Sequence, residues 1–342
     1  MRRLITSLLV VAACVSCSKD SGAELSGSGD VGGSATTTTA SITIATKSDD
    51  AVTSGNSFVD GDMIGIRIED TKTEGNVHTH DDNAHVMALH SEDTDDTDIY
   101  DSDWMFYTGG GYSNELRQIS LEYITNGLED NTSKTSTCNI YAYSPFSSAT
   151  SNFEAVSFDV TKMYDYMWAI YEDFNLLQAN EKAVDLNFKH VMARFRFRMS
   201  ILNTQSGVNI SHIYVNGAKG VTKSGSFNAK TGEVNTSQST ATSITMDVPD
   251  TELSVYVDDD SYAIFDLYLV PMEVSNVGDV YFSFRFDSIG EDLAEVVELP
   301  AREYKAGESY TITLKFDNYG KIVFSDDIIE DEWTDATEDF EI

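Results

Sequence analysis

The first residues that could do chemistry are the histidines and carboxylates between residues 78 and 103. Imidazoles and carboxylates are ligands for zinc or nickel, and the chain offers them at His78, His80, Asp82, His85 and His90. The run Asp93–Asp103 could hold calcium, but it lacks the mid-loop glycine and terminal glutamate of an EF-hand. Residues 70–103 are polar without an apolar period, so the sequence predicts a surface loop that gives a metal no fixed scaffold. We therefore predict no metal and no other cofactor.

Catalytic motifs are missing from the sequence. It contains no G-x-S-x-G elbow, P-loop, G-x-G-x-x-G or H-E-x-x-H, and its 57 acidic residues are too many to single out a glycosidase pair. His190 is predicted to be a hydrogen-bonded structural histidine. Aromatic residues around a Gly-Gly-Gly turn, Trp104, Tyr107 and Tyr112, could form a sugar-binding platform, although such residues more often pack in a core or its rim. We predict that the protein is not an enzyme.

Two cysteines near the N-terminus could carry lipid. Residues 1–16 have a charged start and a short apolar run, which is typical of a signal peptide and too short to anchor stably in a bilayer. Small residues before a cysteine resemble a bacterial lipoprotein box. We predict acylation, with palmitate among the acyl chains, at Cys17, with Cys14 as the alternative. An ordinary cleaved signal remains the other interpretation. If Cys17 is the lipid site, only Cys138 remains besides it, and no disulfide framework is possible.

Composition and charge limit the partners. The chain has 342 residues, enough for two ordinary domains, and 41% hydrophobic residues with 17 Tyr and 17 Phe, which excludes wholesale disorder. The formal net charge of −35 makes nucleic acid and anionic membrane surfaces poor partners. Residues 17–41 are rich in Ser, Gly, Thr and Ala, and we expect a flexible tether there, with order starting at Ser41.

Many short apolar–polar alternations separated by turn residues predict an all-β sandwich protein. The organising stretch is Val184–Ser200, in which the apolar phase slips near Lys189–His190. We predict one long strand with a bulge at the slip and an outer ladder of Arg194, Arg196 and Arg198 that pairs with carboxylates on neighbouring strands. A basic docking strip is the other interpretation of the ladder. Asp165–Gln178 is expected to form a short helix, and turns are expected at Lys223–Gly225 and Thr231–Gly232.

Together, these features resemble the fimbrillin superfamily of Bacteroidetes, whose members build pili. Beyond the lipoprotein start, the resemblance rests on five stretches of the mature chain and a late Trp333. The stretches are Phe58–Ile66, Asn139–Pro145, His190–Arg194, Tyr268–Pro271 and Tyr304–Thr313. The resemblance implies two tandem transthyretin-like Greek-key β-sandwich domains, which we place at residues 42–180 and 181–342.

The resemblance also implies an assembly route. A lipidated precursor reaches the surface of the outer membrane and loses its first strand, here residues 41–47, by proteolysis. A strand of the next subunit fills the groove, so the partners are other fimbrial subunits and an adhesion receptor, and the location is the fimbrium. Processing at Lys47 is the possible cut.

Two departures from the family pattern concern the position in the pilus. Family members that are cut by an arginine-specific protease carry Arg after the first strand, but no arginine lies between Arg3 and Arg67 here. Either a different protease cuts, or the chain is uncut, which would suit a basal anchor. Only Phe340 and Ile342 are apolar in the tail after Trp333, so a spare donor strand is hard to find; Lys321–Ser325 would then complete the chain's own sandwich. That would suit a tip subunit, which we favour. A stand-alone surface lipoprotein that binds glycans is the alternative function.

Overall fold

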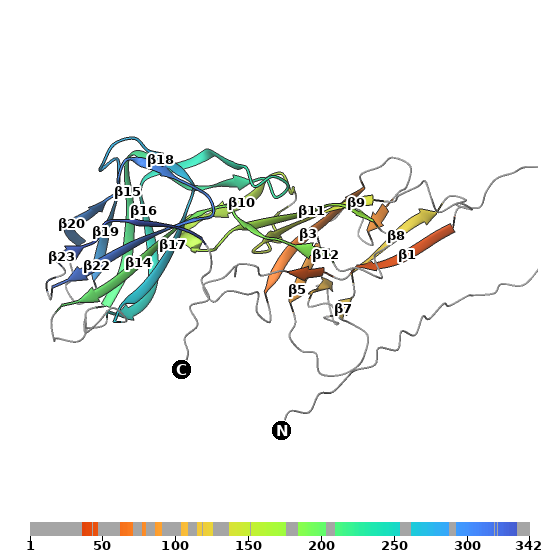
Figure 1. Ribbon diagram of the computed structural model, residues 1–342, viewed down its shortest axis with the longest axis horizontal. Coiled ribbons are helices and arrows are strands. Elements are labelled where there is room, and N and C mark those ends of the chain that lie inside the picture. Colours follow the sequence, from red (N-terminus) through yellow and green to blue (C-terminus); the bar gives the residue numbers. More distant parts are fainter. Residues whose placement is uncertain are drawn as a thin grey trace, which may run out of the picture. The chain divides into compact units, whose positions relative to one another are not determined.

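Most of the residues that the structure describes lie in β-strands (Figure 1). The structure is a computed structural model, and it describes residues 36–42, 44–46, 62–70, 77–79, 86–90, 104–108, 115–117, 119–125, 137–150, 152–175, 184–202, 209–253, 261–286, 292–317, 319 and 321–333. Among them lies one short 3₁₀ turn, η1 (Val160–Lys162), and no α-helix. None of these residues forms a helix of the length and apolarity that would cross a membrane. The all-β class is confirmed, whereas the Greek-key tandem arrangement stays a prediction.

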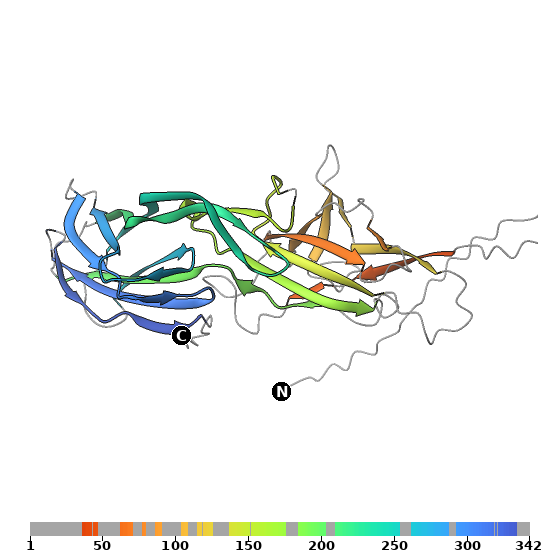
Figure 2. The ribbon, with the colours of Figure 1, turned by 90° about the horizontal axis from the view of Figure 1, so that it is seen from above.

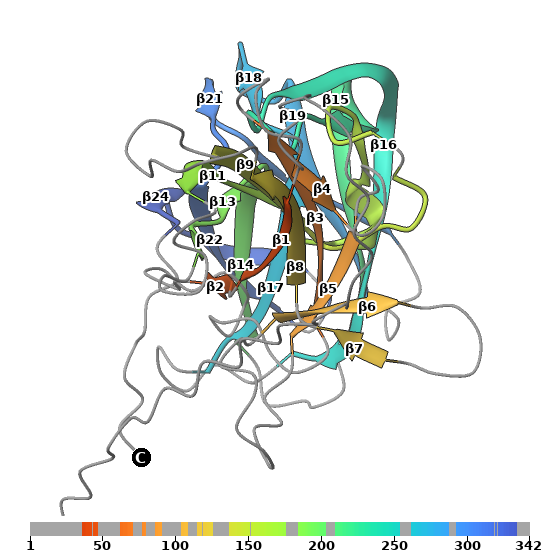
Figure 3. The same cartoon turned by 90° about the vertical axis from the view of Figure 1, so that its right-hand side faces the viewer.

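The first half of the chain builds a seven-stranded sheet in the order β13-β11-β9-β3-β5-β6-β7. Its strands are β3 (Met63–Asp70), β5 (Val86–His90), β6 (Trp104–Thr108), β7 (Glu115–Arg117), β9 (Thr137–Ser144), β11 (Met167–Asn175) and β13 (Lys189–His190). Figure 3 shows β5, β6 and β7 following one another at one end of this sheet. The strand expected to stop at Pro145 is β9, and it ends at Ser144 as predicted.

Two smaller sheets hold the first described strands. β1 (Thr36–Ile42) pairs antiparallel with β8 (Ile119–Thr125), which also pairs with β4 (Val77–Thr79). β2 (Ile44–Thr46) pairs parallel with β12 (Val184–Leu186).

The second half of the chain, together with β10, forms a two-layer sandwich, seen from two sides in Figures 1 and 2. One layer contains β10 (Val156–Asp159), β15 (Asn209–Phe227), β16 (Val234–Glu252), β19 (Val280–Phe286) and β20 (Asp292–Glu298). The other contains β14 (Ala193–Ile201), β17 (Ala263–Leu269), β22 (Glu308–Phe316), β23 (Ile322–Ser325) and β24 (Ile329–Glu332). A two-stranded ribbon pairs β18 (Met272–Val274) with β21 (Arg302–Tyr304).

Alternating side chains from both layers form the core of the sandwich. The rings of Phe195 and Phe197 on β14 lie 5.5 and 4.9 Å from that of Phe282 on β19, measured between centroids. All three side chains are completely buried. Such edge-on and tilted ring contacts are the favourable ones between aromatic residues. The period of two read from the sequence for Val280–Phe286 is confirmed by its strictly alternating burial.

This core also takes in residues from before the expected domain boundary at 180/181. Tyr143, Phe153, Phe158 and Tyr166 belong to the same buried cluster as the sandwich. Contacts group residues 35–342 into one compact unit. The domain ranges 42–180 and 181–342 stay a prediction.

The expectation of a single bent strand over Val184–Ser200 was wrong. The stretch divides into β12, β13 and β14, which belong to three different sheets. Lys189 and His190 pair with Trp168 and Met167 of β11, and the chain then bends and enters the sandwich at Ala193. The phase of the apolar residues therefore shifts where the chain passes from one sheet to the next, because each sheet buries its own set of alternating residues.

The helix expected over Asp165–Gln178 was also wrong, because this segment contains β11. β11 lies between β9 and β13, and Met167 and Ala169 are buried on one face while Trp168 and Ile170 are half-buried on the other. Aromatic and β-branched residues favour a strand once neighbouring strands supply partners, and that pairing is long-range.

Three local expectations need correction as well. Residues 70–103 are not wholly a loop, since β4 and β5 lie in them. The turn expected at Lys223–Gly225 lies inside β15, whereas the turn at Thr231–Gly232 is confirmed between β15 and β16. β1 begins at Thr36, so the last part of the expected tether is a strand.

Candidate functional site

The segment that the sequence analysis singled out for removal, residues 41–47, takes in the end of β1 and all of β2, and both strands lie at sheet edges. β1 is the outermost strand in the order β1-β8-β4, with Thr36 opposite Thr125 and Ile42 opposite Ile119. Within the described strands, β2 is the only hydrogen-bonded partner of β12. Val184 and Leu186 of β12 are completely buried. Removing β1 and β2 would therefore leave the backbone of β12 without its partner and open one edge of β8.

The last described strands complete the chain's own sandwich. β22 pairs parallel with β14 on one side, and on its other side it pairs with β24 at Glu308–Thr311 and with β23 at Leu314–Phe316. This is the role that the sequence analysis offered for Lys321–Ser325.

Trp333 follows β24 and is 5% exposed. Its ring stacks on His190 with centroids 3.6 Å apart and planes 7° apart, and on Tyr268 at 5.5 Å. The Arg194 guanidinium lies 4.7 Å from the Trp333 ring centroid. We call these residues, with Asp165, the Trp333 stack. It fixes the end of β24 at the place where the chain changes sheet after β13.

His190 is hydrogen-bonded as the sequence analysis predicted. Its Nδ1 lies 3.0 Å from Oδ1 of Asp165 and 2.9 Å from Oδ2, but only Oδ1 has hydrogen-bond geometry, and Oδ2 is buried. Burial raises the pKa of Asp165, and the hydrogen bond and charge of His190 oppose this without cancelling it. Burial and the charge of Asp165 raise the pKa of the Tyr268 phenol as well.

In the arginine ladder, the pairing with a carboxylate on a neighbouring strand is seen at Arg196. Arg196 forms a two-pronged ion pair with Asp266 on β17, with both N–O distances 2.8 Å. Arg194 is buried and donates to the Ser309 hydroxyl at 3.0 Å, and Arg198 lies 4.5 Å from the ring centroid of Tyr262. The contacts of the ladder thus include an ion pair, a hydrogen bond to a hydroxyl and a cation–π contact.

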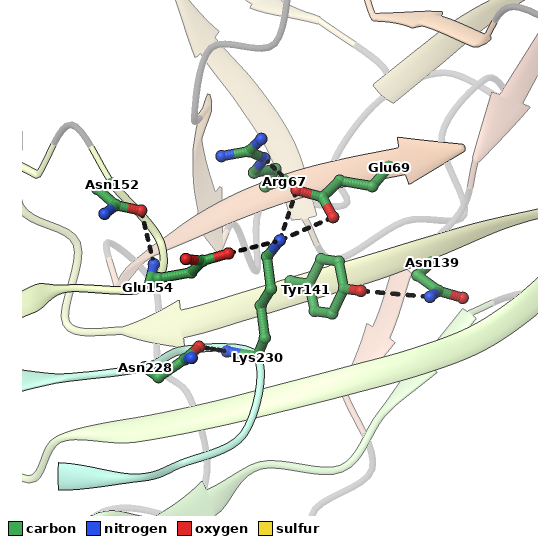
Figure 4. Close-up of polar contacts among 8 residues, drawn as sticks. All are labelled: Arg67, Glu69, Asn139, Tyr141, Asn152, Glu154, Asn228 and Lys230. Atoms are coloured by element: carbon green, nitrogen blue, oxygen red, sulfur yellow. Dashed lines mark hydrogen bonds and ion pairs between the residues drawn. The ribbon is translucent and has the colours of Figure 1, made fainter. Parts of the chain in front are cut away.

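The turn between β15 and β16 docks on the seven-stranded sheet (Figure 4). The Lys230 Nζ lies 2.8 Å from both carboxylate oxygens of Glu69 on β3 and 3.5 Å from Oε1 of Glu154. It also lies 5.1 Å from the ring centroid of Tyr141 on β9. Arg67 adds a second cation 2.8 Å from Glu69. Partial burial alone would lower the pKa of Lys230, but the hydrogen bonds to Glu69 and its charge raise it.

A glycine makes the close approach of this turn possible. Gly232 has φ +75°, and a Cβ there would lie 2.2 Å from Nε1 of Trp168 on β11. Only glycine meets both demands without strain. We call this set of contacts the joint: Arg67, Glu69, Tyr141, Glu154, Trp168, Lys230 and Gly232. It connects the sandwich to three neighbouring strands of the seven-stranded sheet.

Sequence reasoning missed the joint. Lys230 and Glu69 are 161 positions apart, and the sequence around either residue contains no pattern that predicts their contact. The expected turn at Thr231–Gly232 was the one available signal, since a glycine at a turn indicates positive φ.

The other predicted site residues fall largely outside the described residues. These are Cys14, Cys17, Lys47, His80, Asp82, His85, Asp93–Asp103 and Tyr112. His78 lies on β4 and His90 on β5, and Trp104 and Tyr107 lie on β6. In the described part of the chain, no group of three His, Cys, Asp or Glu side chains could hold a metal ion. Cys138 on β9 is buried and is not part of a disulfide.

Comparisons with known proteins agree on one kind of molecule. A family model described as "Fimbrillin-like" matches residues 51–331. A candidate cell adhesion protein of Bacteroides ovatus has a similar structure, with TM-score 0.52, 14% identity, and coverage of 84% of this chain and 97% of that one. Another, of Bacteroides uniformis, has TM-score 0.50, 13% identity, and coverage of 86% and 98%. At these identities the solved structures show the fold. No curated protein matches the chain.

The fold and its terminal strands define a β-sandwich protein whose first strands lie at sheet edges. Its sequence matches the fimbrillin-like model over most of its length. The chain belongs to the fimbrillin-like family. It is therefore a fimbrial or cell-adhesion subunit of the cell surface that associates with other fimbrial subunits, in a family whose role is structural and adhesive.

Proposed function

We propose that the protein is a fimbrial subunit that assembles by strand exchange. Proteolysis removes its first strands, and a strand from the next subunit takes their place. The observation that carries this proposal is the pairing of β2 with β12, because that pair forms a sheet of its own among the described strands. An incoming strand would restore the main-chain hydrogen bonds of β12 and cover the side it exposes.

The location of the possible cut supports the proposal. Lys47 follows directly after Thr46, the last residue of β2. Cleavage after Lys47 would separate β1 and β2 from the rest of the chain in one step. Before that cut, acylation at Cys17, or at Cys14, holds the precursor in the outer membrane.

A tip or accessory position is the one we favour. β23 and β24 are both paired with the chain's own β22, and Trp333 is buried in its stack. A subunit whose last strands are engaged in its own sheet has fewer strands to donate. Because β23 and β24 are paired within their own subunit, the protein fits the end of a fibre better than a position in its middle.

The test is mass spectrometry of the N-terminus of protein sheared from cells and of protein left in the outer membrane. We expect a start after Lys47 in the sheared fraction and an acylated Cys17 in the membrane fraction. An acylated Cys17 as the only start, with all the protein remaining in the membrane fraction, would contradict strand removal and the tip position together.

A further inference from the structure

The last described strand is short, and side chains that can carry a proton hold it at two places. Residues 329–332 pair with residues 308–311 of β22, and the Trp333 N–H donates to the Gly307 carbonyl at 3.2 Å. We call β24 together with Trp333 the strap. Because a pairing of this length has few backbone hydrogen bonds, the side-chain contacts decide how often the strap opens.

The first place is the Trp333 stack. The His190 imidazole lies flat on the Trp333 ring, with centroids 3.6 Å apart and planes 7° apart. The other side of this contact is Asp165, which lies 3.0 Å from the His190 Nδ1 and has a buried oxygen without a hydrogen-bond partner. A protonated imidazole attracts an indole face more strongly than a neutral one, and it also balances the charge of a buried carboxylate. The stack therefore holds Trp333 best when His190 carries its second proton.

The other charged and titratable groups that face the Trp333 stack come from β14 and β17. They are Arg194, 4.7 Å from the Trp333 ring centroid, Arg196, Asp266 and Tyr268. Arg196 and Asp266 are joined in their two-pronged ion pair, and burial raises the pKa of the Tyr268 phenol, so this phenol stays protonated at neutral pH. The pair of Asp165 and His190 is therefore the part of the stack that responds to a proton.

The second place is a pair of carboxyl groups between β22 and β24. The Glu330 carboxyl group donates a hydrogen bond to the Glu308 carboxylate, and this bond raises the pKa of Glu330 and lowers the pKa of Glu308. Once the shared proton leaves, two carboxylates face each other across the strands. The other charged and titratable groups around the pair are Arg302, 2.9 Å from Glu330, Lys305 and the Tyr310 hydroxyl, 3.1 and 3.0 Å from Glu308, and Glu303. The two cations moderate the repulsion without supplying the missing proton.

The direction of the pH effect is the same at both places. The pKa of Asp165 is raised by burial and that of Glu330 by its hydrogen bond, so both groups favour the closed strap fully below their ordinary values of 3.8 and 4.5. This contribution is lost as pH rises through the folded values. Glu308, with its lowered pKa, acts in the opposite direction, and its contribution is lost only as pH falls from 4.5 through the folded value. Above pH 4.5, rising pH therefore weakens the strap.

We propose that the strap is a proton-operated closure. It is shut while the Asp165–His190 pair and the Glu308–Glu330 pair hold their protons, and it opens more often as these protons are lost. Opening frees Trp333 and uncovers the backbone of residues 308–311 of β22, so that this edge becomes available to another strand. The inference goes beyond the removal of β1 and β2, because β22 and β24 lie in a different sheet from those strands.

The experiment is hydrogen–deuterium exchange of the full-length protein, followed by mass spectrometry between about pH 4.5 and pH 8, the range that spans the titration of raised carboxyls and of histidine. Rates are expressed as protection factors, which removes the intrinsic pH dependence of amide exchange. We expect protection of residues 308–311 and 329–333 to fall at least about fivefold over this range, whereas Val280–Phe286 of β19 keeps its protection. Constant protection of the strap, or an equal fall in β19, would overturn the proposal.

Two variants that cannot ionise assign the effect to its groups. Glu330→Gln keeps a donor for Glu308 on an exposed side chain, and Asp165→Asn keeps an acceptor for His190. Each should reduce the pH-dependent loss of protection, and the double variant should leave less than about a twofold change. Glu298→Gln is the matched control, because it removes an exposed carboxylate from β20 in the other layer of the sandwich. An unchanged pH dependence in Glu330→Gln and Asp165→Asn, or the same reduction in Glu298→Gln, would refute the assignment.

Discussion

Lys230 and Lys219 both pair with carboxylates, but in different surroundings. The Lys230 side chain is 20% exposed and lies 2.8 Å from Glu69, whereas Lys219 is 72% exposed and lies 3.3 Å from Asp279. Lys230→Met should lower the free energy of unfolding by about 1–2 kcal/mol, because it leaves Glu69 partly buried beside fewer cations. Lys219→Met should change it by less than about 0.5 kcal/mol. Urea unfolding measures both, and equal losses would contradict the importance of the joint.

The Lys230 contribution has a defined pH range. Its pKa is raised in the folded protein, so its stabilising effect is complete below the ordinary lysine pKa of 10.5 and is lost only as pH rises through the folded value. The difference between the original protein and Lys230→Met should therefore be constant across neutral pH.

Asp165 gives a second pH prediction, in a lower pH range. Its pKa is raised, so its titration favours folding fully below its ordinary value of 3.8, and this is lost as pH rises through the folded pKa. Asp165→Asn keeps an oxygen that can accept from His190 but cannot ionise. Its stability relative to the original protein should therefore increase as pH rises above 3.8 towards the raised folded pKa, as measured by thermal unfolding. A relative stability that falls over this range would show that the ion pair outweighs burial.

A comparison of two glycines separates the cost of a left-handed backbone from the cost of steric crowding. Gly232 lies in the β15–β16 turn, and Gly307 lies directly before β22. Gly232 and Gly307 have φ of +75° and +73°, but a Cβ meets Trp168 at Gly232 and nothing within 4 Å at Gly307. Gly307→Ala should cost about 1 kcal/mol for the left-handed conformation alone. Gly232→Ala should cost at least about 2 kcal/mol more, because the turn must move away from Trp168. Similar losses in the two variants would show that the turn can shift without cost.

The first strands can be tested as replaceable elements. Protein that starts at Ser48 should be stabilised against thermal unfolding by a synthetic peptide of residues 36–47, because the peptide restores the partners of β8 and β12. A peptide carrying Ile42→Asp and Ile44→Asp is the control and should have no effect. Equal stabilisation by both peptides, or by neither, would remove the case for a vacant groove.

The strands were predictable where local pattern and tertiary environment agree. Val280–Phe286 alternates and lies half-buried, so its sequence alone was sufficient. β11 was missed because Trp168, Ile170 and Tyr171 are compatible with several structures, and β9 and β13 decide between them. The joint was missed for a related reason, since the contact between Lys230 and Glu69 exists only after two distant segments have folded.

For the whole molecule, the net charge of −35 should control the rate at which subunits meet. Two such molecules repel one another over about 10 Å in dilute buffer of about 0.1 M ionic strength, and added salt shortens that range. Association of processed subunits, followed by light scattering, should therefore speed up as sodium chloride is raised. Sucrose at equal osmolarity is the control. A rate that falls with salt would indicate that attraction between opposite charges drives the encounter.

The shared core has a consequence for how the protein can be divided. Phe153 and Phe158 precede residue 180 but are buried with Phe227 and the sandwich residues that follow. A fragment ending at residue 180 would expose those rings to water, and a fragment starting at 181 would have gaps where they belong. Neither half should be obtainable as a stable, separately purified protein. During secretion, the chain should accordingly become resistant to proteases in one step, after its last strands have been translocated across the membrane.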